Sequence, residues 1–203
     1  MLHENCFVVY DETSREAAII DPGFYWANEQ QQLTEFIRTQ ELQVKYLLCT
    51  HLHFDHIFGV PFVEDTFGVK LSADLSDAPW IDNFDNSVSR FGIRANGAPR
   101  PVSHPLHDGD ILSLGSSQLE CISTPGHSAG GMCFYAADSK ILIAGDTLFQ
   151  GSIGRTDFSD GNYAQLIQSI QKRLLTLPPD TIVYPGHGAP TTIADEMKYN
   201  PYL

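Results

Sequence analysis

Short apolar runs alternate with polar turns along the whole of this 203-residue chain. The first two runs, at 6–11 and 17–23, flank a turn-like segment and predict a β-hairpin. The segment 27–42 then spaces its apolar residues as one face of a helix. The continuous apolar run VKYLLCT follows at 44–50 and predicts a strand that is buried on both faces.

The rest of the chain repeats this order of strands and helices. We expect a helix at 57–68 and an amphipathic helix at 161–177, where apolar residues recur at helical spacing. Further strands are predicted at 69–72, 111–115, 117–127, 131–138, 140–146 and 180–188. Because no low-complexity linker divides the chain, we predict one α/β domain over residues 1–203, with two sheets flanked by helices.

The segment 74–107 does not fit this simple pattern. Its first part, 74–92, can contain a helix, whereas its second part has the Gly, Pro and Asn content of an irregular loop. Trp80, Phe84 and Phe91 fit either core packing or the lining of a pocket. Long loops in compact domains often form binding loops or lids, so we expect this segment to be a wall of the active site.

Composition and charge narrow the classes of partner. The chain has 12 Lys and Arg against 25 Asp and Glu, a net charge of −13, which disfavours nucleic acid as a partner. No apolar run approaches the roughly 20 residues that span a bilayer, so no membrane segment is expected. With no secretory signal in the N-terminal residues, we expect a cytoplasmic protein whose four cysteines are buried, reduced thiols.

The densest cluster of candidate metal ligands in the chain comes at the end of the predicted strand at 44–50. In THLHFDH, at 50–56, the side chains of His51, His53 and Asp55 alternate, so an extended segment points all three the same way. Asp55 and His56 also lie at the expected start of the next helix, where the chain can turn a second pair of ligands inward. Imidazoles with a carboxylate are ligands that zinc, iron and manganese accept.

Three more candidate ligands follow later strands. His127, Asp146 and His187 each come at the end of an apolar run and beside a glycine, where a tight turn lets a side chain approach an ion. With the first cluster they make seven candidate ligands, more than one tetrahedral ion can use. Two ions that share one bridging carboxylate would use all seven, which predicts a two-metal hydrolytic site.

The HxHxDH cluster, the three later ligands and their spacing resemble the metallo-β-lactamase superfamily over nearly the whole chain. The resemblance implies an αββα four-layer sandwich of two mixed β-sheets flanked by helices. It also implies a first metal held by His51, His53 and His127. The second metal would be held by Asp55, His56 and His187, with Asp146 bridging the two.

Two longer motifs, AGDTLFQGSIGRTDF and PGHGAPTTIADEMKYNPYL, resemble the short bacterial branch of the glyoxalase II-like hydrolases. In that branch Arg155 and Asp157 form a structural ion pair behind the metals. The resemblance also implies that this chain lacks the family's first strand and the C-terminal helical domain of longer members. Asp21 fits a supporting partner of a ligand histidine, although a turn aspartate fits equally well.

The expected activity is hydrolysis of small acyl thioesters such as S-lactoylglutathione, by a hydroxide that bridges two divalent ions. Zinc is the expected metal, with iron and manganese as alternatives, and Asp55 is the ligand that can also orient the water. A mononuclear iron persulfide dioxygenase is the alternative, although that group typically has PAHD where this chain has PGHG. A metal-stabilised module without activity is a third interpretation. The oligomeric state stays open.

Overall fold

The computed structural model describes residues 3–94 and 97–203. Its first sheet has five strands in the order β1-β2-β3-β4-β5. Their bounds are Phe7–Tyr10, Glu16–Ile20, Gln43–Leu48, Leu71–Ala73 and His104–Pro105. The first two strands form the predicted antiparallel hairpin, and the other pairings are parallel. The parallel crossovers contain helices α1 (Ala27–Thr39) and α3 (Val60–Phe67).

The second sheet has six strands in the order β13-β12-β9-β8-β7-β6. In chain order, β6 to β9 are Ile111–Leu114, Ser117–Ser123, Met132–Ala136 and Ile141–Gly145, and β12 and β13 are Ile182–Pro185 and Thr191–Thr192. Only β9 and β12 pair in parallel. The crossover between them carries helix α6 (Tyr163–Ser169), the π-helix Ile170–Leu174 and the small ribbon of β10 (Leu148–Phe149) and β11 (Ser152–Ile153). Helix α7 (Ile193–Tyr199) follows β13.

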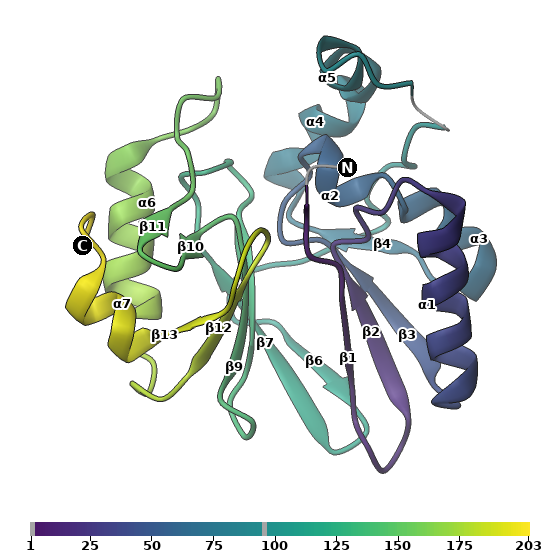
Figure 1. Ribbon diagram of the computed structural model, residues 1–203, viewed down its shortest axis with the longest axis horizontal. Helices are drawn as coiled ribbons and strands as arrows, with labels where there is room; N and C mark the ends of the chain where they lie inside the picture. The colour runs from purple at the N-terminus through teal and green to yellow at the C-terminus, as the bar shows by residue number, and fades with distance from the viewer. Residues whose placement is uncertain (1–2, 95–96) are drawn as a thin grey trace.

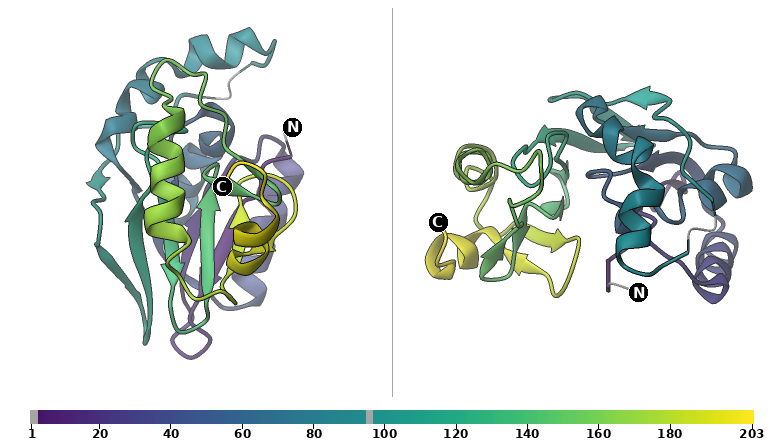
Figure 2. Two further views of the ribbon diagram at one scale, coloured as in Figure 1. Left: turned by 90° about the vertical axis from the view of Figure 1, so that its left-hand side faces the viewer. Right: turned by 90° about the horizontal axis from the view of Figure 1, so that it is seen from above.

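Three apolar clusters separate four layers. Ile19 and Leu47 pack with α1 and α3 on the outer face of the first sheet, whereas their neighbours Ile20 and Leu48 pack between the two sheets. The outer face of the second sheet packs on α6, the π-helix and α7. Viewed from above, the two sheets lie back to back with helices on both outsides (Figure 2). This confirms the predicted αββα sandwich of two mixed sheets.

The local predictions differ from the structure mainly in two places. The burial of β3 on both faces is confirmed only for its last residues, because the first four alternate between exposed and half-buried positions. The segment 74–92 forms a short 3-10 helix (Leu75–Asp77), α4 (Ala78–Asp82) and α5 (Phe84–Arg90). Strand β5 arises inside the expected irregular loop by pairing with β4, while residues 95–96 of that loop lie outside the described part.

The described helices are all too short or too polar to cross a membrane. The four cysteines are free, and three of them are buried, whereas Cys6 is half-buried. In Figure 1 the C-terminus lies beside α7 at the outside of the second half, and α4 and α5 stand above the first sheet.

Candidate metal centre

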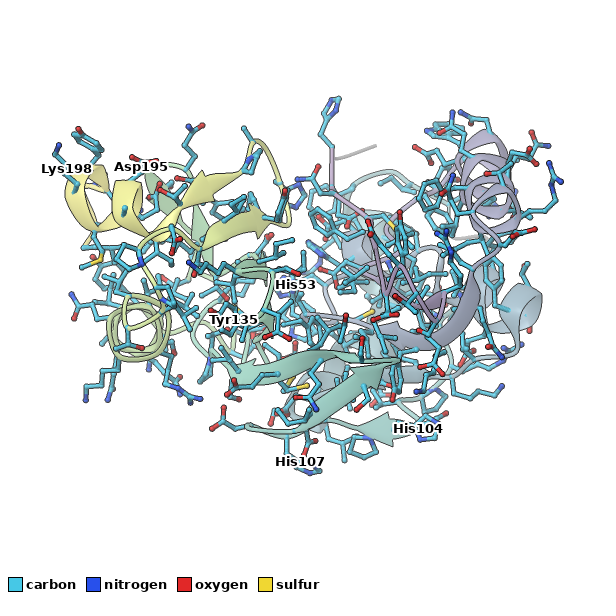
Figure 3. The ribbon with its side chains drawn as sticks, turned by 90° about the horizontal axis from the view of Figure 1, so that it is seen from below. His53, His104, His107, Tyr135, Asp195 and Lys198 are labelled. Atoms are coloured by element: carbon cyan, nitrogen blue, oxygen red, sulfur yellow. The ribbon has the colours of Figure 1, made fainter. Side chains whose placement is uncertain are left out.

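The seven candidate ligands come from four loops that leave the carboxyl ends of strands. His51 and His53 follow β3, and His127, Asp146 and His187 follow β7, β9 and β12, respectively. Because these strand ends meet at one rim of the sandwich, residues more than 130 positions apart come together. Figure 3 shows His53 between the two halves, whereas His104 and His107 lie at the periphery.

The chain changes direction inside the histidine motif. His53 is still extended, with φ −65° and ψ 147°, and helix α2 (Phe54–Ile57) begins at the next residue. His51 and His53 therefore approach the same partner, His127, as the alternation predicts. Asp55 does not follow them, because the first turn of α2 rotates its carboxylate toward His56 and His187. The single helical turn thus divides the motif between two groups of ligands.

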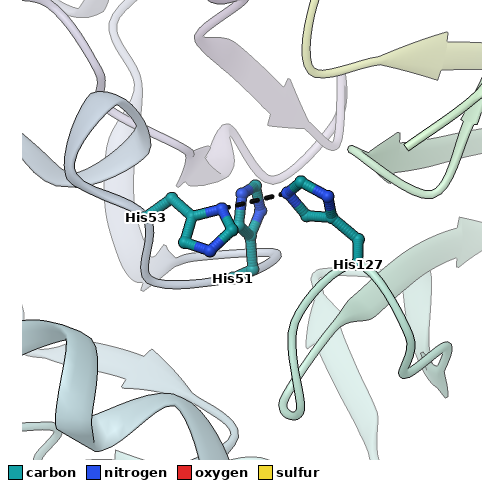
Figure 4. Close-up of side chains that lie close together, drawn as sticks. All are labelled: His51, His53 and His127. Atoms are coloured by element: carbon teal, nitrogen blue, oxygen red, sulfur yellow. Dashed lines mark hydrogen bonds between the residues drawn. The ribbon is translucent and has the colours of Figure 1, made fainter. Parts of the chain in front are cut away.

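The two groups are close enough to share a centre. In the first group, His53 Nδ1 lies 3.0 Å from His127 Nε2, and His51 stands beside both rings (Figure 4). In the second group, His187 Nε2 lies 3.4 Å from Asp55 Oδ2.

The carboxylate of Asp146 reaches both groups. Its Oδ2 lies 3.5 Å from His127 Nε2 and 3.7 Å from His187 Nε2, and its Oδ1 lies 3.6 Å from His56 Nε2. Asp146 therefore lies at the bridging position between the two groups.

These distances fit metal coordination. Two nitrogen ligands on one tetrahedral zinc ion stand about 3.3 Å apart, given metal–ligand bonds of about 2.0–2.1 Å. The observed separations, from 3.0 to 3.7 Å, bracket that value. In addition, Nε2 of His51 and of His56 and Oδ1 of Asp146 are buried without a hydrogen-bond partner in the described protein. Buried polar atoms without partners are costly, and cations at these positions would satisfy them.

A buried hydrogen-bond chain orients two of the imidazoles. Thr50 donates its hydroxyl proton to Asp21 Oδ2 over 2.7 Å, and Thr50 Oγ1 lies 3.1 Å from His51 Nδ1. His56 Nδ1 lies 3.1 Å from the same Asp21 oxygen. Because Thr50 has only one proton to give and a carboxylate only accepts, the protons of both histidines belong on Nδ1. The Nε2 atoms of His51 and His56 are thereby directed into the centre.

The charges of the centre follow from burial and from its carboxylates. Burial lowers the pKa of His51 and His127, and it lowers the pKa of His53 to about 2, so these imidazoles are neutral and can bind metal. Burial alone would lower the pKa of His56, but the charges of Asp21 and Asp146 raise it well above its usual value. The carboxylates therefore stabilise positive charge in the site, and bound divalent cations would supply this charge in place of protons.

A cavity of about 720 Å³ opens over the centre. Its base includes His53, Asp55, His127, Asp146 and His187. Its walls include the aromatic residues Phe54, Trp80, Phe91, Phe149 and Phe158. Trp80 and Phe91 thus line a pocket, whereas Phe84 packs in the core, so the expected wall function of segment 74–107 is confirmed for α4 and α5. The volume of the cavity is that of a small-molecule site.

The comparison with protein families agrees with this geometry. The model of the metallo-beta-lactamase superfamily matches residues 2–187. The chain belongs to this superfamily. Its fold is that of metallo-hydrolases, its histidine and aspartate cluster is suited to metal, and a small molecule is the substrate that such hydrolases suggest.

Individual members of the superfamily resemble the chain over almost its full length. Hydroxyacylglutathione hydrolase GloC of Haemophilus influenzae is 37% identical over 98% of this chain and 92% of that protein. The crystal structure of BLEG-1 B3 metallo-beta-lactamase is 37% identical, with a TM-score of 0.89, and the match covers 100% of this chain and 95% of that one. TTHA1623, solved in a di-iron-bound form, is 34% identical, with a TM-score of 0.87 and 100% and 96% coverage.

Arg155 and Asp157, expected as an ion pair behind the metals, do form a bidentate pair with distances of 2.6 and 2.7 Å. The pair is exposed, however, and stands in the wall of the cavity rather than behind the centre. The support that Arg155 gives to the centre comes from its backbone, because its carbonyl oxygen accepts a hydrogen bond of 2.7 Å from His127 Nδ1. This bond leaves Nε2 of His127 as the nitrogen directed at the ligands.

Sequence reasoning missed Asp77. This fully buried carboxylate accepts hydrogen bonds from Leu52 N, Ser128 Oγ and Gly130 N, and so joins the loop of His51 and His53 to the loop of His127. Burial raises the pKa of Asp77 to about 6 despite these three donors. In the sequence, Asp77 precedes Ala-Pro and has the pattern of a helix cap, so no local signal reveals this function.

Asn5 is a second residue without a local signal. Its Nδ2 donates to the carbonyl oxygens of Pro185 and Gly188, each over 3.0 Å, and its backbone N–H donates to Gly186 over 2.7 Å. These bonds bracket His187 on both sides. The N-terminal segment therefore clamps the loop that carries this candidate ligand.

Proposed function

We propose that this protein is a dinuclear metal-dependent hydrolase of small acyl thioesters, with S-lactoylglutathione as the model substrate. The observation that carries the proposal is the pair of ligand groups joined by Asp146 at the base of one cavity. The similarity to a hydroxyacylglutathione hydrolase supports the choice of a thioester.

The ligand assignment follows the two groups. His51, His53 and His127 would hold one ion, Asp55, His56 and His187 would hold the other, and Asp146 would bridge them. Nitrogen-rich sites of this kind suit zinc, and the di-iron form of TTHA1623 makes iron the first alternative.

The side chains around the centre have distinct tasks in this hydrolysis. When bound, two divalent cations supply a water molecule of lowered pKa and polarise the carbonyl group of the substrate. Burial alone would raise the pKa of Asp55, but the contact with His187 and the charge of His56 hold it at about 2, so Asp55 stays anionic and can accept a hydrogen bond that orients this water. Trp80 and Phe158 contact the His53 ring edge-on and tilted, at 4.4 and 4.5 Å between ring centroids, and exclude bulk water from this side.

A β-lactam is the second candidate substrate, because the matched structure of BLEG-1 is described as a B3 metallo-beta-lactamase. The persulfide dioxygenase stays the alternative, because the crystal structure of ETHE1 from Myxococcus xanthus, 26% identical with a TM-score of 0.78, hints at it, and it is an outcome of the experiment below.

The test is metal analysis and a substrate screen on one preparation of the full chain. We expect close to two metal ions per chain and hydrolysis of S-lactoylglutathione, with weak or no turnover of a chromogenic cephalosporin. His53→Ala should lower hydrolysis at least about 100-fold, as expected for loss of a ligand. His104→Ala, at an exposed histidine far from the centre, is the matched control and should keep wild-type turnover.

Other outcomes would reject the proposal in distinguishable ways. One iron per chain with oxygen consumption on a persulfide would favour the dioxygenase. Faster turnover of the cephalosporin than of any thioester would favour the β-lactamase. Turnover of none of these substrates by fully metal-loaded protein would leave the non-enzymatic module.

A further inference from the structure

Helix α5 presents two polar side chains to the cavity. Ser87 and Arg90 are three residues apart, so they lie on the same face of the helix, and both line the cavity. The other face of α5 is anchored, because Phe84 and Val88 are buried in the core. Phe91, the next residue after the helix, packs against Phe54 of α2 with tilted rings and 4.8 Å between ring centroids. The polar face is therefore held toward the centre rather than left on a free helix.

Arg90 differs from the other charged groups around this cavity. Asp55 and Asp146 belong to the ligand groups, and Arg155 and Asp157 are engaged with each other. In contrast, no carboxylate within the described ranges lies within 4.0 Å of the Arg90 guanidinium, and the Ser87 hydroxyl makes no hydrogen bond there. In a chain with a net charge of −13, this is a cation directed at the substrate space without a partner from the protein.

We propose that Ser87 and Arg90 form an anion-binding subsite for a carboxylate on the thiol portion of the substrate. The inference rests on the proposed thioesterase function and narrows its substrate class to thioesters of a carboxylated, peptide-sized thiol. The planar guanidinium binds a carboxylate through two parallel hydrogen bonds, and the neighbouring hydroxyl supplies a third donor.

The positions of the residues that line the cavity support this assignment. The ligand groups lie at the base, where the scissile carbonyl has to be, while α5 stands in the wall beside the aromatic side chains. A substrate with its carbonyl at the base therefore extends its thiol portion along Trp80 and Phe91 toward Arg90. A volume of about 720 Å³ accepts a tripeptide-sized thiol. One guanidinium and one hydroxyl match a single carboxylate better than the several phosphates of a coenzyme A thioester.

The experiment compares three lactoyl thioesters that share the acyl group: S-lactoylglutathione with carboxylates, S-lactoyl-coenzyme A with phosphates, and the neutral S-lactoyl-N-acetylcysteamine. For Arg90→Ala in the metal-loaded enzyme, we expect the ratio of kcat/KM for the glutathione substrate to that for the neutral substrate to fall about tenfold, mainly through KM. Arg90→Lys should recover part of this ratio, and Ser87→Ala should lower it by a smaller factor. Arg38→Ala removes an exposed arginine of α1 that is paired with Glu35 and serves as the charge-matched control.

A binding measurement makes the result independent of turnover. Calorimetric titration with S-methylglutathione, a thioether that cannot be hydrolysed, should show about tenfold weaker binding to Arg90→Ala than to the wild type or Arg38→Ala. In the wild type this binding should weaken with salt more steeply than in Arg90→Ala.

Several results would overturn the subsite. These are an unchanged ratio in Arg90→Ala, an equal loss on the glutathione and neutral substrates, or a selective loss on the coenzyme A thioester alone. If the wild type hydrolyses none of the three thioesters, the proposed function fails instead, whereas the S-methylglutathione titration still reports on the subsite.

Discussion

Gly186, in the PGHG motif before His187, is the position where one methyl group should change the number of bound metals. A Cβ built on Gly186 would lie 2.7 Å from Cε1 of His56 and closer still to Oδ1 of Asp146, whereas ordinary contacts begin at 3.4 Å. Gly186→Ala therefore has to displace His56 by about 0.7 Å and Asp146 by more. Metal–ligand distances tolerate only about 0.2 Å.

The displaced groups are a ligand of the second group and the bridging carboxylate. We therefore expect Gly186→Ala to weaken the second metal by at least about 100-fold, or about 2.7 kcal/mol, and to retain one metal per chain after dialysis. Metal analysis after dialysis and competition with a chromophoric chelator measure both quantities, and circular dichroism checks the fold.

A control separates this effect from a general loss of stability. Gly68 ends α3 with φ +72°, and a Cβ there would meet nothing within 4 Å. Gly68→Ala should cost about 1–2 kcal/mol of unfolding free energy through the left-handed backbone alone, with two metals still bound. If Gly186→Ala also binds two metals with wild-type affinity, the contact argument and the assignment of His56 and Asp146 to a shared centre are both refuted.

Three further predictions concern residues that support the centre through hydrogen bonds. Asp21→Asn fits the left-handed backbone at this residue, φ +49°, but its amide has one accepting oxygen and cannot accept all three hydrogen bonds that Asp21 receives, two from Thr50 and one from His56. Metal affinity should therefore fall 10- to 100-fold in chelator competition, and affinity equal to wild type would reject the orienting role. Burial raises the pKa of Asp77 in the folded protein to about 6 from 3.8, so the contribution of Asp77 to stability is complete below pH 4 and is lost as the pH rises through 6. The free energy of unfolding of the metal-free protein should therefore decline by about 3 kcal/mol over this range. The variant Asp77→Asn should lack this pH-dependent decline. Parallel pH curves for the two proteins would contradict this. Asn5→Ala removes the clamp around His187 and should lower kcat/KM about tenfold with little change in the melting temperature; an equal loss in both would indicate a structural effect only.

Much of this protein can be predicted from local patterns because each pattern reports a local physical constraint. Alternation and helical spacing locate the hairpin, α1, β3 and α6, since apolar residues on one face need a neighbouring layer to cover them. The histidine motif and the three ligands beside glycines are visible for a similar reason, because metal ligands must be few, polar and close to a turn.

Contacts between distant segments could not be predicted in this way. Strand β5 has only two residues and exists because β4 is beside it. The carboxylate of Asp77 has the sequence pattern of a cap, yet it joins two loops whose bonded residues Leu52 and Ser128 are 76 positions apart in the chain. The direction of Asp55 likewise depends on the single turn of α2 and on His187 from the other sheet.

The sequence by itself therefore determined one α/β domain with two sheets flanked by helices, the seven candidate ligands and their loops, since periodicity and residue type are local properties. The resemblance to the superfamily already implied how the ligands divide around Asp146. Only the tertiary structure decided the distances between them and the contacts of Asp77 and Asn5 that hold their loops. It also decided that Ser87 and Arg90 face the same cavity. These are distances between segments remote in the chain, and they are set by the packing of the two sheets rather than by any local pattern.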